Sequence, residues 1–403
     1  MAEQHEKALV PQIRFTGFTD PWEQRKLSDL TDRVSIQSSD SDLPQVEYED
    51  IIPGEGTLNK DLRDKKGGKT GIKFYAGDVL YGKLRPYLMN WLYPQFNGVA
   101  VGDFWVLRAT ECDSSFLYRL VQTGSFQRLA NVSSGSKMPR ADWNLISQSF
   151  FAVPADHAEQ KAIAKGLAEL DTLITLHQRK YDKLCVLKKS MLDKMFPKGG
   201  SLYPEIRFAG FTDPWEQRKL GDVARRVTRK NENRDSDLPL TISAQYGLVD
   251  QRTFFNNQVA SKDMSGYFLL HKGEFAYNKS TSTDSPWGAI KRLEKYDMGC
   301  VSTLYICFEL LSGDPDFLVT YYETDRWYKA VQLIAAEGAR NHGLLNIAPD
   351  DFFETQICIP KRIDEQRQIG AFFDRLDSLI TLHQRKLELL RNIKKSMLDK
   401  MFV

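Results

Sequence analysis

The chain has 403 residues, long enough for two or three domains, and its 42% hydrophobic and 27% charged residues are typical of globular proteins. A formal net charge of +2 does not by itself indicate a nucleic-acid-binding protein. The charged beginning does not resemble a secretory signal, and no apolar run approaches the roughly 20 residues that cross a bilayer, so we expect a cytoplasmic protein. The 5 cysteines include no Cys-x-x-Cys pair, which favours reduced thiols over disulfides or a zinc site.

Three stretches of the chain occur twice. Residues 13–27, IRFTGFTDPWEQRKL, return at 206–220 with one substitution. LDTLITLHQRK at 170–180 returns almost unchanged at 376–386, and KKSMLDKMF at 188–196 returns unchanged at 394–402. We call these stretches the frame segments, and we expect Trp22 and Trp215 within them to be packing anchors. Such repetition predicts two copies of one unit instead of a single large domain.

The regions between the frame segments have diverged, but weaker matches continue through them. Lys83 corresponds to Lys279 and Gly135 to Gly338, and the separation between matching residues rises slowly along the chain, as small loop insertions would produce. Short β-rich runs at 79–81, 104–107 and 303–308 and helical stretches at 115–130 and 316–336 predict α+β domains with a mostly antiparallel or mixed sheet. We therefore expect two homologous variable domains.

Each variable domain is followed by a predicted long helix, in which a mostly apolar set of residues alternates spacings of three and four as in a coiled-coil seam. The first seam is Ile163, Leu167, Leu170, Ile174, His177, Tyr181, Leu184, Lys188, Met191 and Met195, and the second is Ile369, Phe373, Leu376, Ile380, His383, Leu387, Leu390, Lys394, Met397 and Met401. We expect helices of about 40 residues that pair antiparallel about a pseudo-twofold axis and act as a spacer between the domains. The alternative is that each helix packs only on its own domain.

Three further expectations concern these helices. His177 and His383 occupy seam positions, and we expect them to form hydrogen bonds between the helices, because no cluster of metal-binding residues recurs beside them. Leu173, Leu176 and Leu192 are expected on exposed helix faces, where they would suit contact with a partner. The predicted boundaries are a first domain at 1–153, a helical spacer at 154–200, a second domain at 201–359 and a second spacer at 360–403.

Several strings resemble catalytic motifs but lack an essential part. Gly-Lys-Thr at 68–70 ends like a phosphate-binding loop, but Arg63 stands where the earlier glycine is required. Asp-Pro-Trp at 20–22 is similar to the loop of amino-methyltransferases, but the second proline and a glycine-rich cofactor loop are missing. Glu-x-Lys at 159–161 has the wrong carboxylate spacing for a metal nuclease. We therefore expect no intrinsic catalysis.

The repeated Arg-Phe-x-Gly-Phe-x-x-x-Trp-Glu-Gln-Arg-Lys-Leu openings at 14–27 and 207–220 resemble the specificity subunits of Type I restriction-modification systems. In that family each target-recognition domain leads into a Pro-x-x-x-x-Glu-Gln turn that opens a long helix. The strings at 154–160 and 360–366 fit this form. The resemblance extends from about residue 11 to the end; it is strong in the frame segments and weak in the variable domains.

From the resemblance together with the patterns above, we expect an α+β fold with two homologous target-recognition domains joined by two long helices in an antiparallel coiled coil. The resemblance implies a non-catalytic subunit that recruits two methyltransferase subunits, and then restriction subunits, to a bipartite site on double-stranded DNA. Each variable domain would read one half-site, and the helices would set the unread gap. No cofactor is expected in this chain; S-adenosylmethionine, ATP and magnesium are expected on the partner subunits.

Candidate DNA-contacting residues lie in the loops that match between the two domains, where Arg and Lys suit guanine and Asn suits adenine. In the first domain they are Lys83, Arg85, Tyr87, Ser136, Lys137 and Arg140, and in the second they are Asn278, Lys279, Ser280, Thr281, Arg340 and Asn341. The matched lysines would hold phosphates while their unmatched neighbours read bases. The alternative for each residue is a solvated loop side chain or a buried strand end.

Two other functions remain open from the sequence. A coiled-coil adaptor that binds only protein would share the repeats and the seams but would not protect DNA. A single-chain DNA-modifying enzyme would require a cofactor loop that we do not find in the sequence.

Overall fold

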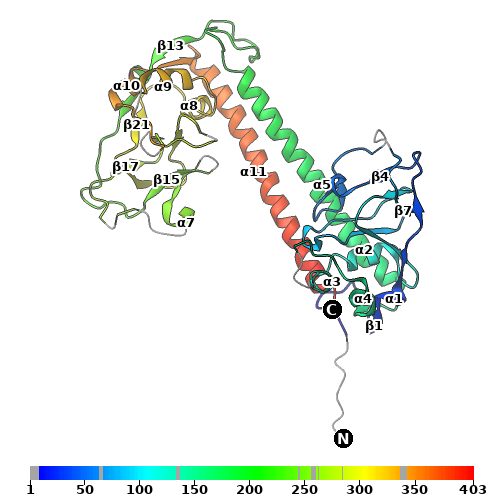
Figure 1. Cartoon of the computed structure of the whole chain (residues 1–403). Helices are drawn as coiled ribbons and strands as arrows, with labels where there is room; N and C mark the ends of the chain where they lie inside the picture. Colours follow the sequence, from blue (N-terminus) through cyan, green and yellow to red (C-terminus); the bar gives the residue numbers. More distant parts are fainter. Residues whose placement is uncertain are drawn as a thin grey trace. The chain divides into compact units, whose positions relative to one another are not determined.

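The computed structural model describes residues 9–62, 67–132, 137–243, 246–255, 260–261, 263–283, 285–335 and 343–403 (Figure 1). The chain forms two compact units. The first consists of Met1–Arg179 together with His383–Val403, and the second consists of Lys180–Leu382. Each unit therefore contains one variable domain and parts of both long helices.

The first unit contains two small four-stranded sheets. One has the antiparallel order β2 (Thr31–Val34), β11 (Phe104–Ala109), β8 (Val79–Gly82) and β9 (Trp91–Leu92). The other has the order β3 (Gln37–Ser38), β7 (Gly71–Phe74), β10 (Gly98–Ala100) and β4 (Gln45–Val46), in which β10 and β4 are parallel. β5 (Ile51–Ile52) pairs with β6 (Thr57–Leu58), and β1 (Glu23–Lys26) pairs with β12 (Phe150–Val153). The predicted strands at 79–81 and 104–107 and the mostly antiparallel sheets are confirmed.

Short helices connect these strands before the long helix begins. They are α1 (Leu27–Leu30), η1 (Tyr48–Asp50), η2 (Pro86–Leu88), α2 (Ser114–Leu120), α3 (Gly124–Ala130) and α4 (Trp143–Gln148). Asp113 caps α2 and Asp142 caps α4, because their carboxylates accept hydrogen bonds from the first free backbone amides. β12 then leads into α5 (His157–Lys194), the first long helix.

The second unit repeats part of this plan with its own strands. Its main sheet has the antiparallel order β14 (Ala224–Arg226), β21 (Ile306–Leu310), β18 (Phe275–Asn278) and β19 (Ala289–Arg292). Antiparallel pairs are formed by β13 (Glu216–Lys219) with β22 (Gln356–Ile359), β15 (Leu240–Ser243) with β16 (Gly247–Asp250), and β17 (Phe268–His271) with β20 (Met298–Val301). The helices are α6 (Leu220–Val223), α7 (Gln251–Phe255), α8 (Pro315–Tyr321), α9 (Tyr328–Ile334), α10 (Pro349–Phe353) and the long α11 (Ile363–Lys400). The predicted strand at 303–308 begins later, at Ile306, because a turn precedes it.

The helices predicted at 115–130 and 316–336 are wrong as single helices. In the first unit α2 ends at Leu120 and α3 begins at Gly124, because the Thr123 hydroxyl donates to the Leu120 carbonyl (2.7 Å) and accepts from the Phe126 amide. In the second unit the Thr324 hydroxyl donates to the Tyr321 carbonyl (2.6 Å) where α8 ends. The apolar periodicity continues across the break, whereas a threonine satisfies the backbone groups there.

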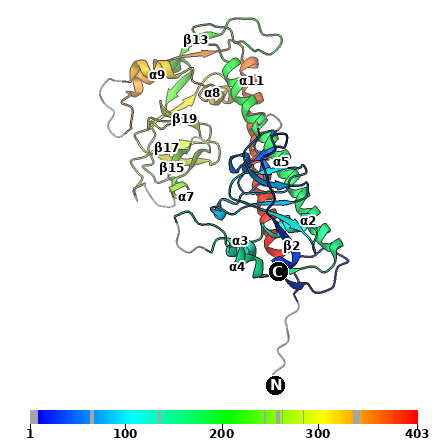
Figure 2. The same ribbon diagram turned by 45° about the vertical axis from the view of Figure 1, so that its right-hand side comes forward.

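The two long helices have 38 residues each, close to the predicted length. Every predicted seam residue is buried or half-buried, so the seam is confirmed on both helices. α5 begins in the first unit and ends in the second, whereas α11 begins in the second and ends in the first. The red end of α11 lies among the blue and cyan elements of the first unit in Figures 1 and 2. Within the described residues, no helix combines the length and apolarity that a membrane span requires.

Candidate DNA interface and its supporting frame

A buried carboxylate ties the first frame segment to the long helix of the first unit. Glu159, in the first turn of α5, is 2% exposed and accepts two hydrogen bonds from Arg14, Nε to Oε1 at 2.6 Å and Nη2 to Oε2 at 2.7 Å. The Trp22 indole donates a third bond to Oε1 at 3.2 Å. Burial of a carboxylate is costly unless it is paired, and the bidentate arginine supplies the charge and the geometry. The hydrogen bond to Glu159 also raises the pKa of Arg14.

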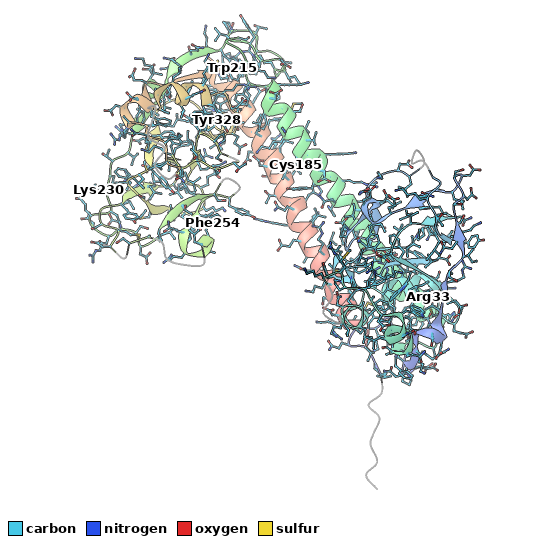
Figure 3. All side chains as sticks on the ribbon, viewed as in Figure 1. Arg33, Cys185, Trp215, Lys230, Phe254 and Tyr328 are labelled. Atoms are coloured by element: carbon cyan, nitrogen blue, oxygen red, sulfur yellow. The ribbon has the colours of Figure 1, made fainter. Side chains whose placement is uncertain are left out.

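The second unit contains the same arrangement. Arg207 donates from Nε at 2.6 Å and from Nη2 at 2.8 Å to Glu365, and the Trp215 indole donates to Glu365 at 3.1 Å. Trp215 is labelled in Figure 3. We call Arg14, Trp22 and Glu159 the first clamp, and Arg207, Trp215 and Glu365 the second clamp. Trp22 is 3% exposed and Trp215 is 1% exposed, so the prediction of packing anchors is confirmed. Trp22 and Trp215 also form hydrogen bonds, which the sequence interpretation missed.

The glutamine that follows each clamp glutamate fixes a second connection. In the first unit, Gln160 accepts from the Asp113 amide at 2.7 Å and donates to the Pro154 carbonyl at 2.8 Å. In the second unit, Gln366 accepts from the Asp314 amide and donates to the Pro360 carbonyl, both at 2.8 Å. The Pro-x-x-x-x-Glu-Gln string therefore joins three elements in each unit: the frame segment, the long helix and the helix capped by the aspartate. The repeated Glu-Gln was the sequence signal for this role.

The aromatic residue that follows each long helix enters the core of a clamp. Phe402 lies edge-on to Trp22 with ring centroids 6.1 Å apart and stacks on Phe116 at 5.4 Å in the first unit. Phe196 lies edge-on to Trp215 at 5.8 Å in the second unit. Phe196 follows α5, whose beginning belongs to the first unit, and Phe402 follows α11, whose beginning belongs to the second. The core of each unit is therefore completed by the C-terminal end of the long helix that begins in the other unit.

In each unit, antiparallel segments of α5 and α11 pair. In the first unit, Nδ1 of His177 lies 2.8 Å from Nδ1 of His383, and Lys394 pairs with Asp171 at 2.7 Å. A hydrogen bond between two Nδ1 atoms requires one ring to donate and the other to accept. The predicted hydrogen bond between the helices is therefore confirmed, and each histidine contacts its own repeat counterpart, as a local twofold relation requires.

In the second unit, the half-buried Lys188 on α5 forms the ion pair that joins the helices. Lys188 pairs with Asp377 at 2.6 Å and with Glu323 at 2.7 Å. Burial lowers the pKa of Lys188, but the attraction of the two carboxylates outweighs burial, so the pKa lies above its ordinary value. Burial raises the pKa of Asp377 despite its contact with Lys188. Lys188 corresponds to Lys394 and Asp377 to Asp171, so the same ion pair joins the helices in both units.

In the first domain, the two loops predicted to contact DNA lie together. We call residues 83–90 and 137–141 the first loop pair. The Ala141 amide donates to the Lys83 carbonyl at 2.9 Å, and the Arg85 amide donates to the Pro139 carbonyl at 2.7 Å. Lys83 and Arg140 pair with the same carboxylate, that of Asp103, at 3.5 Å and 3.0 Å. The side chains of Arg85, Tyr87, Lys137 and Arg140 are exposed.

In the second domain, the corresponding loops are joined in the same way. We call residues 278–283, 285 and 343–345 the second loop pair. The Leu345 amide donates to the Lys279 carbonyl at 3.0 Å, and the Thr281 amide donates to the Gly343 carbonyl at 2.7 Å. The Lys279 amino group donates to the Ile347 carbonyl at 3.2 Å, and burial lowers its pKa. The Asn278 side chain accepts from the Ser280 amide at 3.0 Å, and the Ser280 side chain is exposed.

Three of the predicted contact residues, Ser136, Arg340 and Asn341, lie outside the described residues. For the others the structure brings together the loops that the sequence matched, but their role in DNA binding stays a prediction, as do the predicted domain boundaries. Within the described ranges, no group of three or more His, Cys, Asp and Glu residues is placed to hold a metal ion.

The predicted exposure of leucines on the long helices is correct at two of three positions. Leu173 is 44% exposed and Leu176 is 49% exposed in the first unit. Their repeat counterparts in the second unit, Leu379 and Leu382, are 43% and 45% exposed. The prediction for Leu192 is wrong, because this side chain is half-buried against the core that contains Trp215.

Comparisons with known proteins agree with the resemblance. No protein-family model matches the chain. The Type I restriction enzyme EcoDI specificity subunit of Escherichia coli is 26% identical over 203 residues, so the match spans 47% of this chain and less than half, 46%, of that relative.

One solved structure extends the likeness to the fold, and a second is similar over most of its length. The crystal structure of a Type I restriction-modification S subunit from M. genitalium covers 98% of this chain and 99% of its own, with a TM-score of 0.61 and 12% identity. The HsdS subunit from Thermoanaerobacter tengcongensis covers 94% of this chain and 96% of its own, with a TM-score of 0.45 and 17% identity. The M. genitalium structure confirms the predicted fold class of two α+β domains joined by two long helices, and the resemblance to specificity subunits is confirmed.

Proposed function

We propose that this chain is the DNA sequence-specificity subunit of a Type I restriction-modification complex. Each variable domain would read one half of a bipartite target on double-stranded DNA. One observation carries the proposal: the two clamps are identical in residues and nearly identical in distances, whereas the side chains of the two loop pairs differ. Identical supports that hold two different exposed loop pairs suit a protein that reads two different half-sites.

The proposal assigns no catalytic group to this chain. Adenine methylation would be performed by methyltransferase subunits with S-adenosylmethionine, and cleavage by restriction subunits with ATP and magnesium. The sequence supports this division, because each string that resembles a catalytic motif lacks an essential residue. The E. coli relative is likewise named as a specificity subunit.

We propose the exposed leucines of the long helices as docking surfaces for the methyltransferase subunits. Leu173 and Leu176 in the first unit and Leu379 and Leu382 in the second are exposed at equivalent positions of one frame segment. Exposed apolar residues that recur at equivalent positions favour the same partner twice. This repetition supports two methyltransferase subunits for each chain.

The long helices would set the number of unread base pairs between the half-sites. α5 and α11 are continuous over 38 residues each and pass between the units. Two half-sites must be presented in phase with the helical repeat of the duplex. Paired helices are stiffer than a loop, so they suit a defined gap length.

The central experiment is methylation by the chain together with its methyltransferase subunit, followed by mapping of methylated adenines on genomic DNA. We expect a two-part sequence that is absent when either protein is omitted. Methylation by the chain alone would contradict the proposal. The exposed leucines would also suit a protein-binding adaptor. Nuclease footprinting distinguishes the two functions, because an adaptor would protect no DNA.

A domain replacement tests the division of labour. Exchange of residues 35–153 for the equivalent stretch of a relative should change one half-site and leave the other half-site and the gap unchanged. A change in both half-sites would contradict independent reading. Insertion of one heptad near Leu187 in α5, with a matched insertion at the equivalent position of α11, should alter the gap or abolish binding without changing either half-site.

A further inference from the structure

Three consecutive large side chains project from the first loop pair. Tyr87 is 54% exposed, Leu88 is 40% exposed and Met89 is 44% exposed. They lie in or directly after the short helix η2, whose flanking residues Arg85 and Met89 have positive φ angles of 49° and 55°. This backbone region is rare for residues other than glycine, and such strain persists only where the surrounding structure enforces it.

The backbone of this loop is held at several points. The Arg85 amide donates to the Pro139 carbonyl at 2.7 Å, and the Leu88 amide donates to the Arg85 carbonyl at 2.8 Å. The Met89 carbonyl accepts from the Gly54 amide at 2.9 Å. An exposed apolar cluster ordinarily folds back onto the core to leave water. Here the fixed backbone keeps the side chains of Tyr87, Leu88 and Met89 at the surface.

The surroundings of this apolar tip are positively charged. Lys83 and Arg140 share the single carboxylate of Asp103, and Arg85 and Lys137 are exposed beside them. Glu55, which follows the Gly54 that donates to Met89, is paired with Arg391 at 3.3 Å. The cations around the tip therefore outnumber the carboxylates, and an excess of positive charge suits the phosphates that line a DNA groove. Each edge of a base pair in the major groove presents hydrogen-bonding groups, and the C5 methyl group of thymine is its apolar feature.

We infer that Tyr87, Leu88 and Met89 read the C5 methyl group of thymine in the half-site of the first domain. The inference rests on the proposed function and adds part of the target sequence to it. Insertion of the same side chains between base pairs would also bury them, but unstacking a base step costs a few kcal/mol. Contact with a methyl group that already projects into the groove has no such cost.

The second domain lacks the apolar tip and therefore serves as a control for the first. In the sequence, residues 280–285 of the corresponding loop read Ser-Thr-Ser-Thr-Asp-Ser in place of the apolar tip, and Asp284, which lies outside the described residues, corresponds to Leu88. The Thr281 hydroxyl donates to the Gly343 carbonyl at 3.0 Å. Short hydroxyl side chains and a carboxylate offer polar groups instead of a large apolar surface. The second loop pair should therefore be indifferent to the thymine methyl group.

The test uses the full chain in complex with its methyltransferase subunit and duplexes that carry the mapped bipartite target. Each thymine is replaced in turn by deoxyuridine, which removes only the methyl group. We expect at least one replacement in the first half-site to weaken binding by about fourfold, the effect of one buried methyl-sized group. Replacements in the second half-site should change affinity by less than about twofold, well below the loss expected for one buried methyl group.

Protein variants then show which side chains contact the thymine methyl group. A Tyr87→Ser, Leu88→Ser, Met89→Ser triple variant should bind thymine and deoxyuridine duplexes equally, whereas Ile36→Ser, which removes a 56% exposed side chain of the same domain, should retain the preference. Unfolding midpoints of both variants establish that they fold. A variant that fails to fold is replaced by the single change Leu88→Ser, judged by the same preference.

Several results would overturn the inference while leaving the proposed function intact. They are a mapped first half-site without thymine, an equal response to deoxyuridine in both half-sites, or a triple variant that retains the preference. A rise in 2-aminopurine fluorescence on binding, at a step of the first half-site, would favour unstacking and also overturn it. If the complex binds no specific sequence, the proposed function fails and the inference fails with it.

Discussion

The clamps and the loop pairs differ in what holds them, and the difference explains why one is repeated and the other has diverged. Glu159 and Glu365 are buried, and each depends on one arginine and one tryptophan side chain, so a substitution would leave a buried charge unpaired. The loop pairs are joined by backbone bonds, such as Ala141 to Lys83 and Leu345 to Lys279. Almost any residue supplies these backbone groups, so loop side chains can change while the loop stays in place.

The largest effect is expected where a helix end completes a core. Phe196→Ala removes a side chain that is 1% exposed and contacts Trp215, and should lower the free energy of unfolding by about 4 kcal/mol. Phe150→Ala is the matched control, because Phe150 is 59% exposed, and should cost less than about 1 kcal/mol. Urea denaturation monitored by circular dichroism measures both. Equal losses would contradict the distinction between frame and surface.

The clamps should be almost as sensitive. Glu159→Gln keeps the shape but leaves Arg14 without its charge partner, and should cost about 3 kcal/mol of unfolding free energy. Glu365→Gln should cost about the same, because the two clamps share their contacts. Glu23→Gln breaks an exposed pair with Arg25 at 3.9 Å and should cost less than about 0.5 kcal/mol. If the first two variants unfold like the third, the clamps are not the support we describe.

The loop pairs should show the reverse behaviour. Arg85→Ala removes an exposed cation and should leave the unfolding free energy within about 0.5 kcal/mol of the parent. Binding of the mapped target should weaken by about tenfold, since contacts of an arginine with a base contribute about 1–3 kcal/mol. Gel-shift titration at fixed salt measures the affinity, and Lys165→Ala on the exposed face of α5 serves as control. A loss of stability without a loss of DNA binding would contradict the role of Arg85 in DNA contact.

The smallest effect is expected in the pH dependence of the helix pair. Burial lowers the folded-state pKa of Lys188, but Glu323 and Asp377 together raise it by more, so it lies above its ordinary value of 10.5. The stability it contributes is therefore fully present below about pH 10.5 and is lost as the pH rises through the folded-state pKa. Unfolding free energies compared between the parent and Lys188→Met from about pH 9 to 12 should converge with rising pH. Parallel curves would contradict the role of this ion pair.

Much of the fold was predictable because buried side chains must recur with the period of their helix. The seam positions from Ile163 to Met195 were correctly identified in this way. The break at Thr123 was not, because the apolar period continues across it and one hydroxyl decides the local structure. Leu192 was misplaced for a related reason: its exposure depends on the core of the second unit and not on its own helix.

The site was only partly predictable. Matching glycines and lysines identified the loops that the structure brings together, because recurrence survives where backbone geometry must be kept. The clamp role of Glu159 was missed, although Arg14, Trp22 and the Glu-Gln pair all recur, because a buried ion pair leaves no periodic signal. The bases read by each domain depend on loop side chains that differ between the two domains. The repeated residues therefore do not predict these bases.

The exchange of helix ends has a consequence for synthesis on the ribosome. The core around Trp22 includes Met401 and Phe402, so the domain that is translated first stays incomplete until these late residues emerge. The core around Trp215 uses Met195, Phe196 and residues of α11 as far as Leu376, all of which are made earlier. The later-translated domain is thus the first to have all of its core available. Premature termination shortly before Met401 would therefore damage the domain nearest the beginning of the message.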